Sequence, residues 1–393
     1  MTRLPNQGPR AEAKSPTPAE RATSSRRLRV VPVGPGPGIS DLPSGAHNFP
    51  ARLPDFVGRS SEIEAIEDQL LSSRLVTVTG SSGMGKTRLT LEVATRVHDA
   101  YPNGAWLVEL APCAQPVLVS QAVASALGLD PEPGRDPADG VVAHLAEAEA
   151  LLVLDNCEHV VSACAALVER LLADCPRLRV LATSQQPLGV TGERTTSLDP
   201  LSLSGTTAGE SEAVALFCAR AAASNPAFTL TEEVRPAIAE ICDRLDGIPL
   251  AIELAAARLV ALGPADIAER LHDRFRLLTQ GSPGAEPRHQ TLAAALDWSY
   301  DLLTTEEATL FRRMSVFAGG ATLHAVEEVC TGKGAPRDDA VDLLTSLVAK
   351  SFVIADTTRP RARYRLLETI RAYAHTRLEE SGETDAIRAR HAA

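Results

Sequence analysis

The feature that most constrains the fold is the run GSSGMGKT at residues 80–87. It fits the pattern G-x-x-x-x-G-K-[ST] and follows LVTVT, a β-branched apolar run that is typical of a buried strand. After it, Leu89, Val93 and Val97 recur at the spacing of one helical face. A glycine loop between a strand and a helix lets backbone N–H groups turn inward and bind phosphate oxygens. The motif therefore predicts a phosphate-binding α/β fold.

The first half of the chain alternates between strand-like and helix-like runs. Apolar, β-branched runs predict strands at 75–79, 105–110, 151–155 and 178–184, with an edge strand within 196–203. Apolar residues at helical spacing predict helices near 63–70, 116–129 and 160–174. Because strands alternate with helices, the sequence predicts a parallel sheet covered by helices on both faces.

From about residue 211 the alternation stops. Helical runs separated by Asn-Pro, Gly-Ile-Pro and Gly-Pro breaks predict a helical domain. From residue 288, further helical runs lead into two strand-like runs, FVIAD (352–356) and ARYRLL (362–367). A hairpin after a small helical bundle is similar to a winged helix. The predicted fold is an α/β P-loop NTPase domain with a parallel sheet, followed by a helical domain and a winged-helix domain.

Composition indicates where the folded part of the chain begins. Residues 1–54 hold 10 of the 27 prolines, and we predict a disordered, mildly basic leader there because it cannot bury enough apolar surface to fold. The other predicted units are a P-loop nucleotide-binding α/β domain, a helical domain, a winged-helix domain and the truncated start of a further helical region. They span residues 55–204, 205–284, 285–381 and 382–393.

Charge and cysteine content narrow the class of protein. The chain carries 39 Lys and Arg against 50 Asp and Glu, a net charge of −11, which matches nucleic acid poorly outside a local basic patch. Its 7 cysteines form no CxxC pair, so we expect reduced, mostly buried thiols. No apolar run reaches the roughly 18 residues that span a bilayer, and none follows the N-terminal arginines as in a signal peptide. We therefore expect a cytoplasmic protein with no membrane partner.

The glycine motif also names candidate nucleotide and metal ligands. Lys86 is placed to reach the β- and γ-phosphates, and Thr87 to coordinate Mg²⁺. Asp155 closes the apolar run LLVLD at the edge where open α/β sheets bind ligands, so we expect it to hold Mg²⁺ as well. The remaining predicted ligands around the loop are Gly80, Ser81, Ser82, Gly83, Met84, Gly85 and Arg88.

Hydrolysis also needs a group that orients or deprotonates water. Asn156 follows Asp155, and an amide cannot act as a base. In the sequence DNCEH, Glu158 and His159 are the nearest candidates, and we take Glu158 as the candidate catalytic base. Either residue could instead cap the next helix or make a structural contact.

Three motifs in one order, GSSGMGKT, LLVLDNCEH and GIPLAIELAAAR (247–258), resemble the NB-ARC (AP-ATPase) branch of the STAND class of signal-transduction P-loop ATPases. Over about residues 48–393 the chain is similar to the ATPase region of bacterial SARP-type and LuxR-type transcriptional regulators. The resemblance implies that Val57 and Arg59 of FVGRSSEIEAI reach the nucleotide, and that Pro249 packs on the adenine.

The chain departs from this family at two positions. Gln185, in LRVLATSQQPLGVTGE (178–193), stands where the family usually has the sensor arginine. Glutamine can hydrogen-bond a γ-phosphate but lacks the charge of a guanidinium, so ATP sensing would be weaker or another arginine such as Arg59 would supply it. The winged-helix histidine that touches ADP in some relatives is also absent, and Arg363 and Arg365 are both candidates to replace it.

The resemblance implies an ATP/ADP-operated switch with slow hydrolysis, within a transcriptional regulator. Its expected partners are nucleotide with Mg²⁺ and other copies of the chain on activation, with DNA reached only through regions outside this chain. One alternative is a turnover ATPase that uses hydrolysis for work. Another is DNA binding through the winged helix, although residues 288–379 carry twelve basic and twelve acidic side chains.

Overall fold

The computed structural model describes residues 46–51, 55–130, 134–205, 211–226, 228–278, 290–358 and 360–393. Its first domain contains a parallel sheet of five strands in the order β2-β3-β4-β1-β5. The strands are β1 (Leu75–Thr79), β2 (Ala105–Glu109), β3 (Leu151–Asp155), β4 (Arg179–Ser184) and β5 (Arg194–Ser197). The first four confirm the predicted strands to within a residue at either end.

The fifth strand does not lie where the sequence predicted it. An edge strand within 196–203 is wrong for most of that range, because β5 ends at Ser197. Beyond it, Pro200 has no N–H to donate to a strand, and Leu201 N–H donates to the carbonyl of Gly247 at 2.9 Å instead. The chain thus leaves the sheet and joins the helical region.

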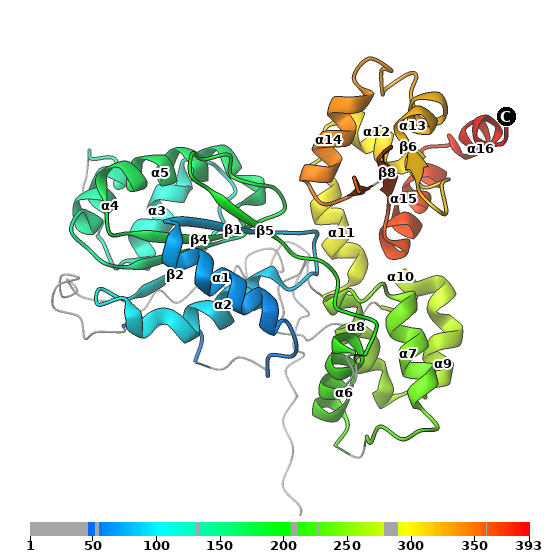
Figure 1. Cartoon of the computed structure of the whole chain (residues 1–393), viewed down its shortest axis with the longest axis horizontal. Helices are drawn as coiled ribbons and strands as arrows, with labels where there is room; N and C mark the ends of the chain where they lie inside the picture. Colours follow the sequence, from blue (N-terminus) through cyan, green and yellow to red (C-terminus); the bar gives the residue numbers. More distant parts are fainter. Residues whose placement is uncertain are drawn as a thin grey trace, which may run out of the picture. The chain divides into compact units, whose positions relative to one another are not determined.

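Helices cover both faces of this sheet, as predicted (Figure 1). Val76 and Val78 point to the core shared with α1 (Ser60–Ser72) and α2 (Lys86–Val97). Leu152 and Leu154 point to the opposite core, which is built with α3 (Leu118–Ala126), α4 (Pro137–Leu145) and α5 (Val161–Asp174). Strands buried on both faces explain why their sequences are continuously apolar rather than alternating.

Part of the predicted leader is attached to the sheet. Residues 1–45 and 52–54 lie outside the described residues, but residues 46–51 lie along β2. The carbonyl of Ala46 accepts the N–H of Ala105 at 2.9 Å, and Asn48 bonds both backbone groups of Leu107 at 2.7 and 2.9 Å. Phe49 is buried. For this short segment the prediction of disorder is wrong, because it pairs with a sheet edge and buries an aromatic ring.

A helical region follows the sheet domain. Its α-helices are α6 (Glu212–Ser224), α7 (Arg235–Arg244), α8 (Pro249–Ala256), α9 (Pro264–Arg270) and α10 (Arg274–Leu277). Pro249 and Pro264 each occupy the first position of a helix, where the missing N–H costs nothing. The breaks that the sequence predicted at Gly-Ile-Pro and Gly-Pro are therefore helix starts.

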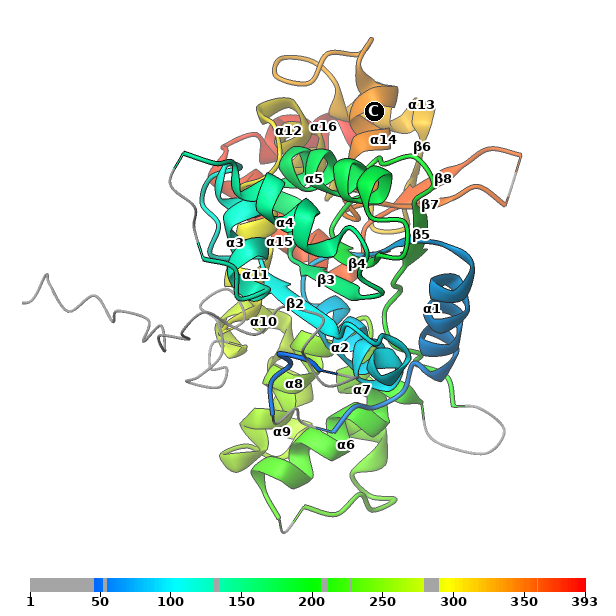
Figure 2. The same cartoon turned by 90° about the vertical axis from the view of Figure 1, so that its left-hand side faces the viewer.

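The last part is a winged helix-turn-helix domain. Its helices are α11 (Leu292–Tyr300), α12 (Thr305–Met314), α13 (Leu323–Cys330), α14 (Ala340–Ala349) and α15 (Glu368–Glu380), and α16 (Thr384–Ala392) follows. Strands β6 (Ala321–Thr322), β7 (Ile354–Asp356) and β8 (Arg363–Arg365) form an antiparallel sheet in the order β6-β8-β7. Figure 2 shows the β7–β8 hairpin extending away from α12 and α14 as a wing.

The helical region is joined to this domain by a carboxylate. The start of α15 has no side-chain cap of its own, and Asp246, in the turn between α7 and α8, supplies one. Its two oxygens accept the N–H groups of Glu368 and Thr369 at 3.0 and 2.6 Å. A carboxylate at a helix N-terminus satisfies open donors and is stabilised by the helix dipole.

The seven cysteines are free thiols, and six of them are buried, which confirms the predicted burial. A hydrogen bond with Cys164 and complete burial hold the pKa of Cys157 well above its usual range. This thiol, two residues after Asp155, therefore stays protonated and is no nucleophile. Within the described part of the chain, no helix has the length and apolar character needed to cross a bilayer.

Candidate functional site

The loop GSSGMGKT lies between β1 and α2, as predicted. Gly85 takes a left-handed conformation with φ 86° and caps α2, so the open N–H groups of the first helical turn are not covered by a side chain. Gly83 has φ 81°, and a Cβ there would lie 3.0 Å from the Cβ of Leu250. The backbone N–H of Leu250 also donates to the carbonyl of Gly83 at 3.1 Å. Only glycine allows the start of α8 to pack directly on the loop.

Lys86 lies beneath the loop. Its Nζ donates to the carbonyls of Gly80 and Ser81 at 2.8 and 3.1 Å, and the side chain is buried. Of the predicted ligands in this stretch, the continuous run Ser82 to Arg88 lines a pocket, whereas Gly80 and Ser81 do not. We call Ser82–Arg88 the loop side of the pocket.

Asp155 and Thr87 are brought together, as expected from the sequence. Asp155 is buried, and its Oδ1 accepts the hydroxyl of Thr87 at 2.7 Å. Asn156 Nδ2 donates to Oδ2 at 2.6 Å. A carboxylate and a hydroxyl whose oxygens meet in this way fit the oxygen ligands that Mg²⁺ prefers.

Thr183, on β4, is a site residue that the sequence analysis missed. Its hydroxyl donates to Asp155 Oδ1 at 2.6 Å and accepts the N–H of Asn156 at 2.8 Å. The second contact orients the Thr183 hydroxyl, and the first uses that hydroxyl to hold the Asp155 carboxylate. The available signal was a threonine within an otherwise apolar strand, but its role depends on the pairing of β4 with β3.

The two candidate bases differ in their surroundings. Glu158 lines the pocket, and its Oε2 is buried without a hydrogen-bond partner among the described residues. His159 does not line the pocket, and its Nε2 contacts the carbonyl of Cys113 at 3.1 Å. Its ring packs edge-on against Trp298 of α11, with centroids 5.7 Å apart. The geometry therefore favours Glu158 over His159 as a group that can act on a ligand.

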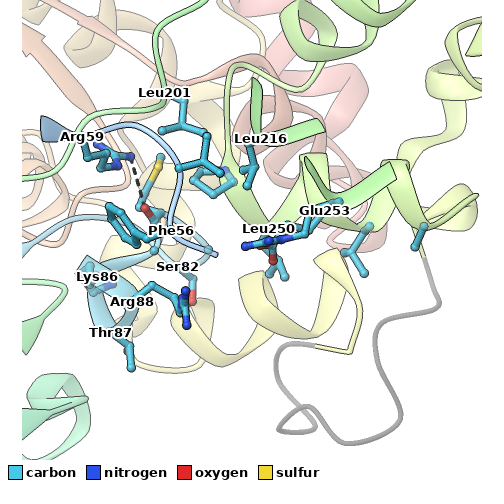
Figure 3. A pocket seen from close by; sticks show the side chains of 18 of the residues that line it. Phe56, Arg59, Ser82, Lys86, Thr87, Arg88, Leu201, Leu216, Leu250 and Glu253 are labelled. Carbon is cyan, nitrogen blue, oxygen red and sulfur yellow. Dashed lines mark hydrogen bonds and ion pairs between the residues drawn. The ribbon is translucent and has the colours of Figure 1, made fainter. Parts of the chain in front are cut away.

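The pocket has a volume of about 550 Å³, in the range typical of small-molecule sites. The pocket also has an apolar side, on which the sequence-predicted Val57 and Pro249 are found. Figure 3 shows Lys86, Thr87 and Arg88 on one side of the pocket and Leu216, Leu250 and Glu253 on the other. The apolar side comprises Phe56, Val57, Leu201, Leu216, Pro249, Leu250 and Leu254.

Arg59 lines the pocket but is engaged by the protein. Its guanidinium contacts Glu62 at 2.9 Å and the carbonyls of Met84 and Asp199 at 3.3 and 2.8 Å. The Met84 contact is the dashed line in Figure 3. In this structure these bonds attach the Arg59 guanidinium to the loop backbone at Met84 and to residues 62 and 199.

Gln185 lies outside the pocket lining and is held by the winged helix-turn-helix domain. Its Nε2 donates to Ser299 Oγ at 2.8 Å, and its backbone carbonyl accepts the hydroxyl of Ser351 at 3.0 Å. The candidates Arg363 and Arg365 are also absent from the pocket lining, and Arg363 donates to the carbonyls of residues 319 and 320.

Three charged side chains also line the pocket, namely Arg88 of the loop side, Arg220 of α6 and Glu253 of α8. Arg220 Nε contacts Glu253 Oε1 at 2.8 Å. Burial lowers the pKa of the Arg88 guanidinium, and the neighbouring Arg220 lowers it further.

Comparisons with known proteins agree with this architecture. A model of the AAA ATPase domain matches residues 55–204, and a model of a winged helix-turn-helix domain matches residues 303–379. The Mycobacterium tuberculosis protein Rv0894, described as an uncharacterized protein, is 41% identical over 350 residues, which cover 88% of this chain and 86% of Rv0894. The chain belongs to the Rv0894 family.

The chain is also similar to a second named M. tuberculosis protein and to one solved structure. The chain is 46% identical over 322 residues to the M. tuberculosis protein named "Putative HTH-type transcriptional regulator Rv0890c", covering 82% of the chain but 36% of that relative. It therefore spans about a third of the length of Rv0890c. The fold resembles the Walker-type ATPase PABY2304 of Pyrococcus abyssi, with a TM-score of 0.55 and 13% identity over 81% of this chain and 96% of that one. The chain is thus an AAA-type P-loop ATPase domain, a helical region and a winged helix-turn-helix domain.

Proposed function

We propose that this chain is an ATP/ADP-binding switch of the STAND/NB-ARC class and the regulatory ATPase part of a cytoplasmic transcriptional regulator. The likeness to Rv0890c supports regulation of transcription. The proposal adds that the bound nucleotide controls whether the winged helix-turn-helix domain stays attached to the ATPase domain. Assembly into homo-oligomers on activation is part of the same proposal.

The two sides of the pocket suit the two parts of a nucleotide. On the loop side, the backbone of residues 82–88 and Lys86 would bind the phosphates, and Thr87 and Asp155 would hold Mg²⁺, which neutralises phosphate charge. On the apolar side, Pro249 would pack on the adenine. The peptide N–H and C=O of Val57, which no described residue bonds, offer one donor and one acceptor, the complement of the N1 and amino edge of adenine.

The observation that carries the switch is the contact of α11 with Gln185 and His159, which follow β4 and β3. Ser299 holds Gln185 at the end of β4, and the neighbouring Trp298 packs on His159, next to Glu158. A γ-phosphate that recruits Gln185 has to compete with Ser299 for the same amide. ATP would therefore weaken this contact relative to ADP.

The size of the response follows from the difference in affinity. A nucleotide shifts the equilibrium between attached and released states only by its differential affinity for the two. One neutral hydrogen bond contributes about 1 kcal/mol, so Gln185 alone would shift the equilibrium about five-fold. A larger response would require the Trp298 contact to change as well.

The first test is to purify the chain without added nucleotide, denature it and identify any released nucleotide by chromatography. The proposal predicts near-stoichiometric ADP, because a switch held by its ligand exchanges slowly. A protein that emerges empty and binds neither ADP nor ATP on titration would overturn it.

A turnover ATPase is the second candidate, and the buried, unpaired Oε2 of Glu158 favours it. A carboxylate oxygen that has no hydrogen-bond partner among the described residues can accept a proton from water. This function predicts multiple turnover, with loss of hydrolysis but not of binding in Glu158→Gln. Glu169→Gln, on the exposed face of α5, is the matched control. Turnover that is equal in wild type and Glu158→Gln would exclude Glu158 as the base.

DNA binding is the third candidate, since it is the common role of a winged helix-turn-helix domain. In this chain the start of α14, which occupies the position of a recognition helix, carries the exposed carboxylates Asp338, Asp339 and Asp342. Carboxylates at this end of the helix repel phosphates and cannot release counterions as lysine or arginine would. A salt-dependent gel shift of duplex DNA by the whole chain would support direct binding, and no shift at low salt would exclude it.

A further inference from the structure

The apolar side of the pocket begins with a short extended segment, residues 55–59, which we call the entry segment. Phe56 and Val57 line the pocket and are half-buried. Among the described residues, none forms a hydrogen bond with the backbone N–H or C=O of Phe56 or Val57, while the backbone groups on either side are bonded. Open peptide groups beside a pocket are costly unless a ligand or water satisfies them.

One face of α6 runs along this segment. Glu212, Leu216 and Arg220 are four residues apart, so they lie in a row on the same helical face. Leu216 lines the pocket together with Phe56, as Figure 3 shows. The row therefore presents an anion, an apolar group and a cation in sequence.

The two charged ends of the row hold the backbone of the entry segment. Glu212 Oε1 accepts the N–H of Arg59 at 2.5 Å, and Arg220 Nη2 donates to the carbonyl of Asp55 at 3.2 Å. Gly58 has φ +75°, and a Cβ there would lie 2.7 Å from Glu212 Oε1, so the contact requires glycine. Each end thus satisfies one backbone group and leaves the peptide groups between them open.

We propose that Glu212, Leu216 and Arg220 form a positioning row that fixes the entry segment as the base-reading edge of the pocket and so determines which nucleobase is accepted. This inference rests on the proposed nucleotide binding. None of the three side chains needs to touch the base itself. Their role is to hold the N–H and C=O of Val57 at a fixed place. A backbone donor and acceptor discriminate adenine from guanine only when the peptide cannot rotate to present them in the opposite order.

The position of the row separates its effect from phosphate binding. Glu212 bonds the entry segment and the N–H of Ser202, and Arg220 bonds the entry segment and Glu253 of α8. Within the described residues, neither bonds the loop backbone. Loss of either contact should therefore alter base selection and leave phosphate affinity unchanged. A merely structural role would lower both together, because the whole pocket would loosen.

The test compares ATP, GTP and inorganic tripolyphosphate, each with Mg²⁺, in equilibrium binding to the whole chain. The variants are Arg220→Met, which keeps the aliphatic stem, and Glu212→Gln, which keeps an acceptor without the charge. Arg270→Met is the matched control, since Arg270 forms a similar ion pair with Asp266 on the exposed helix α9. Hydrogen bonds to charged groups predict a loss of ATP affinity of about ten-fold or more for Arg220→Met, with a smaller preference for ATP over GTP.

The outcomes are distinct. Unchanged tripolyphosphate affinity with a reduced ATP:GTP preference supports the positioning row. Equal losses for all three ligands, or unchanged binding of all three in both variants, would overturn it. If Arg220→Met fails to fold, Arg220→Lys and Glu212→Gln give the same comparison. Wild-type protein that binds neither nucleotide would overturn the proposed function, and the inference with it.

Discussion

The two sides of the pocket are built in different ways. The loop side is one continuous run, Ser82–Arg88, whose backbone geometry is set by its own glycines and by the helix that follows. The apolar side is assembled from the entry segment, α6, α8 and the chain after β5, which are up to about two hundred residues apart in sequence.

This difference predicts different responses to substitution. A local motif carries charge that any phosphate ligand uses, so its loss affects all ligands. A surface assembled from distant segments carries shape and backbone direction, so its loss affects only ligands that have a base. The following variants test this division, from the largest expected effect to the smallest.

Lys86→Ala should reduce the affinity for ATP, ADP and tripolyphosphate alike, by about a hundred-fold, because charge-assisted contacts to phosphate are lost. Isothermal titration measures the affinities, and thermal unfolding checks that the chain remains folded. Lys333→Ala, at an exposed position, is the control. Unchanged binding of all three ligands would remove this loop as the phosphate site.

Asp155→Asn should remove the effect of Mg²⁺ on ATP binding, a change of about ten-fold, because an amide is a far poorer ligand for a hard cation than a carboxylate. The measurement is ATP affinity with Mg²⁺ and with a chelator. Asp174→Asn, at the exposed end of α5, is the control. A Mg²⁺ effect that survives in Asp155→Asn would place the metal elsewhere.

Pro249→Ala should lower ATP and ADP affinity about five-fold and leave tripolyphosphate affinity unchanged, because it removes apolar surface that a base would cover. Pro264→Ala is a close control, since both prolines stand at the first position of a helix. Equal effects of Pro249→Ala on tripolyphosphate and ATP would break the division between the two sides.

Ser299→Ala should raise the affinity for ATP relative to ADP by a few-fold, because it releases the amide of Gln185 at the cost of one neutral hydrogen bond. Ser315→Ala is the control, since Ser315 is a buried serine of the same domain whose hydroxyl has no hydrogen-bond partner among the described residues. An identical ATP:ADP ratio in wild type and Ser299→Ala would separate Gln185 from nucleotide sensing.

The same division explains what could be predicted from sequence. The loop, Asp155 and strands β1 to β4 follow from local patterns, and the structure places them as expected. Thr183, Glu212 and Arg220 depend on strand pairing and helix packing, which no local pattern reports. Helix α4 was missed although Asp136 and Pro137 form a regular helix start, because Asp139 and Gly140 weaken the helical pattern that follows.

The winged helix-turn-helix domain has several attachments, of which the Asp246 cap on α15 and the bonds to Gln185 are unequal. Its bonds to the helical region involve a full charge, whereas its bonds to Gln185 are neutral. The neutral ones should break first, so the domain would turn about Asp246 as a pivot rather than separate. Because Asp246 lies three residues before Pro249, such a rotation would displace the start of α8. Movement of the winged helix-turn-helix domain would therefore change the part of the pocket that is proposed to hold the base.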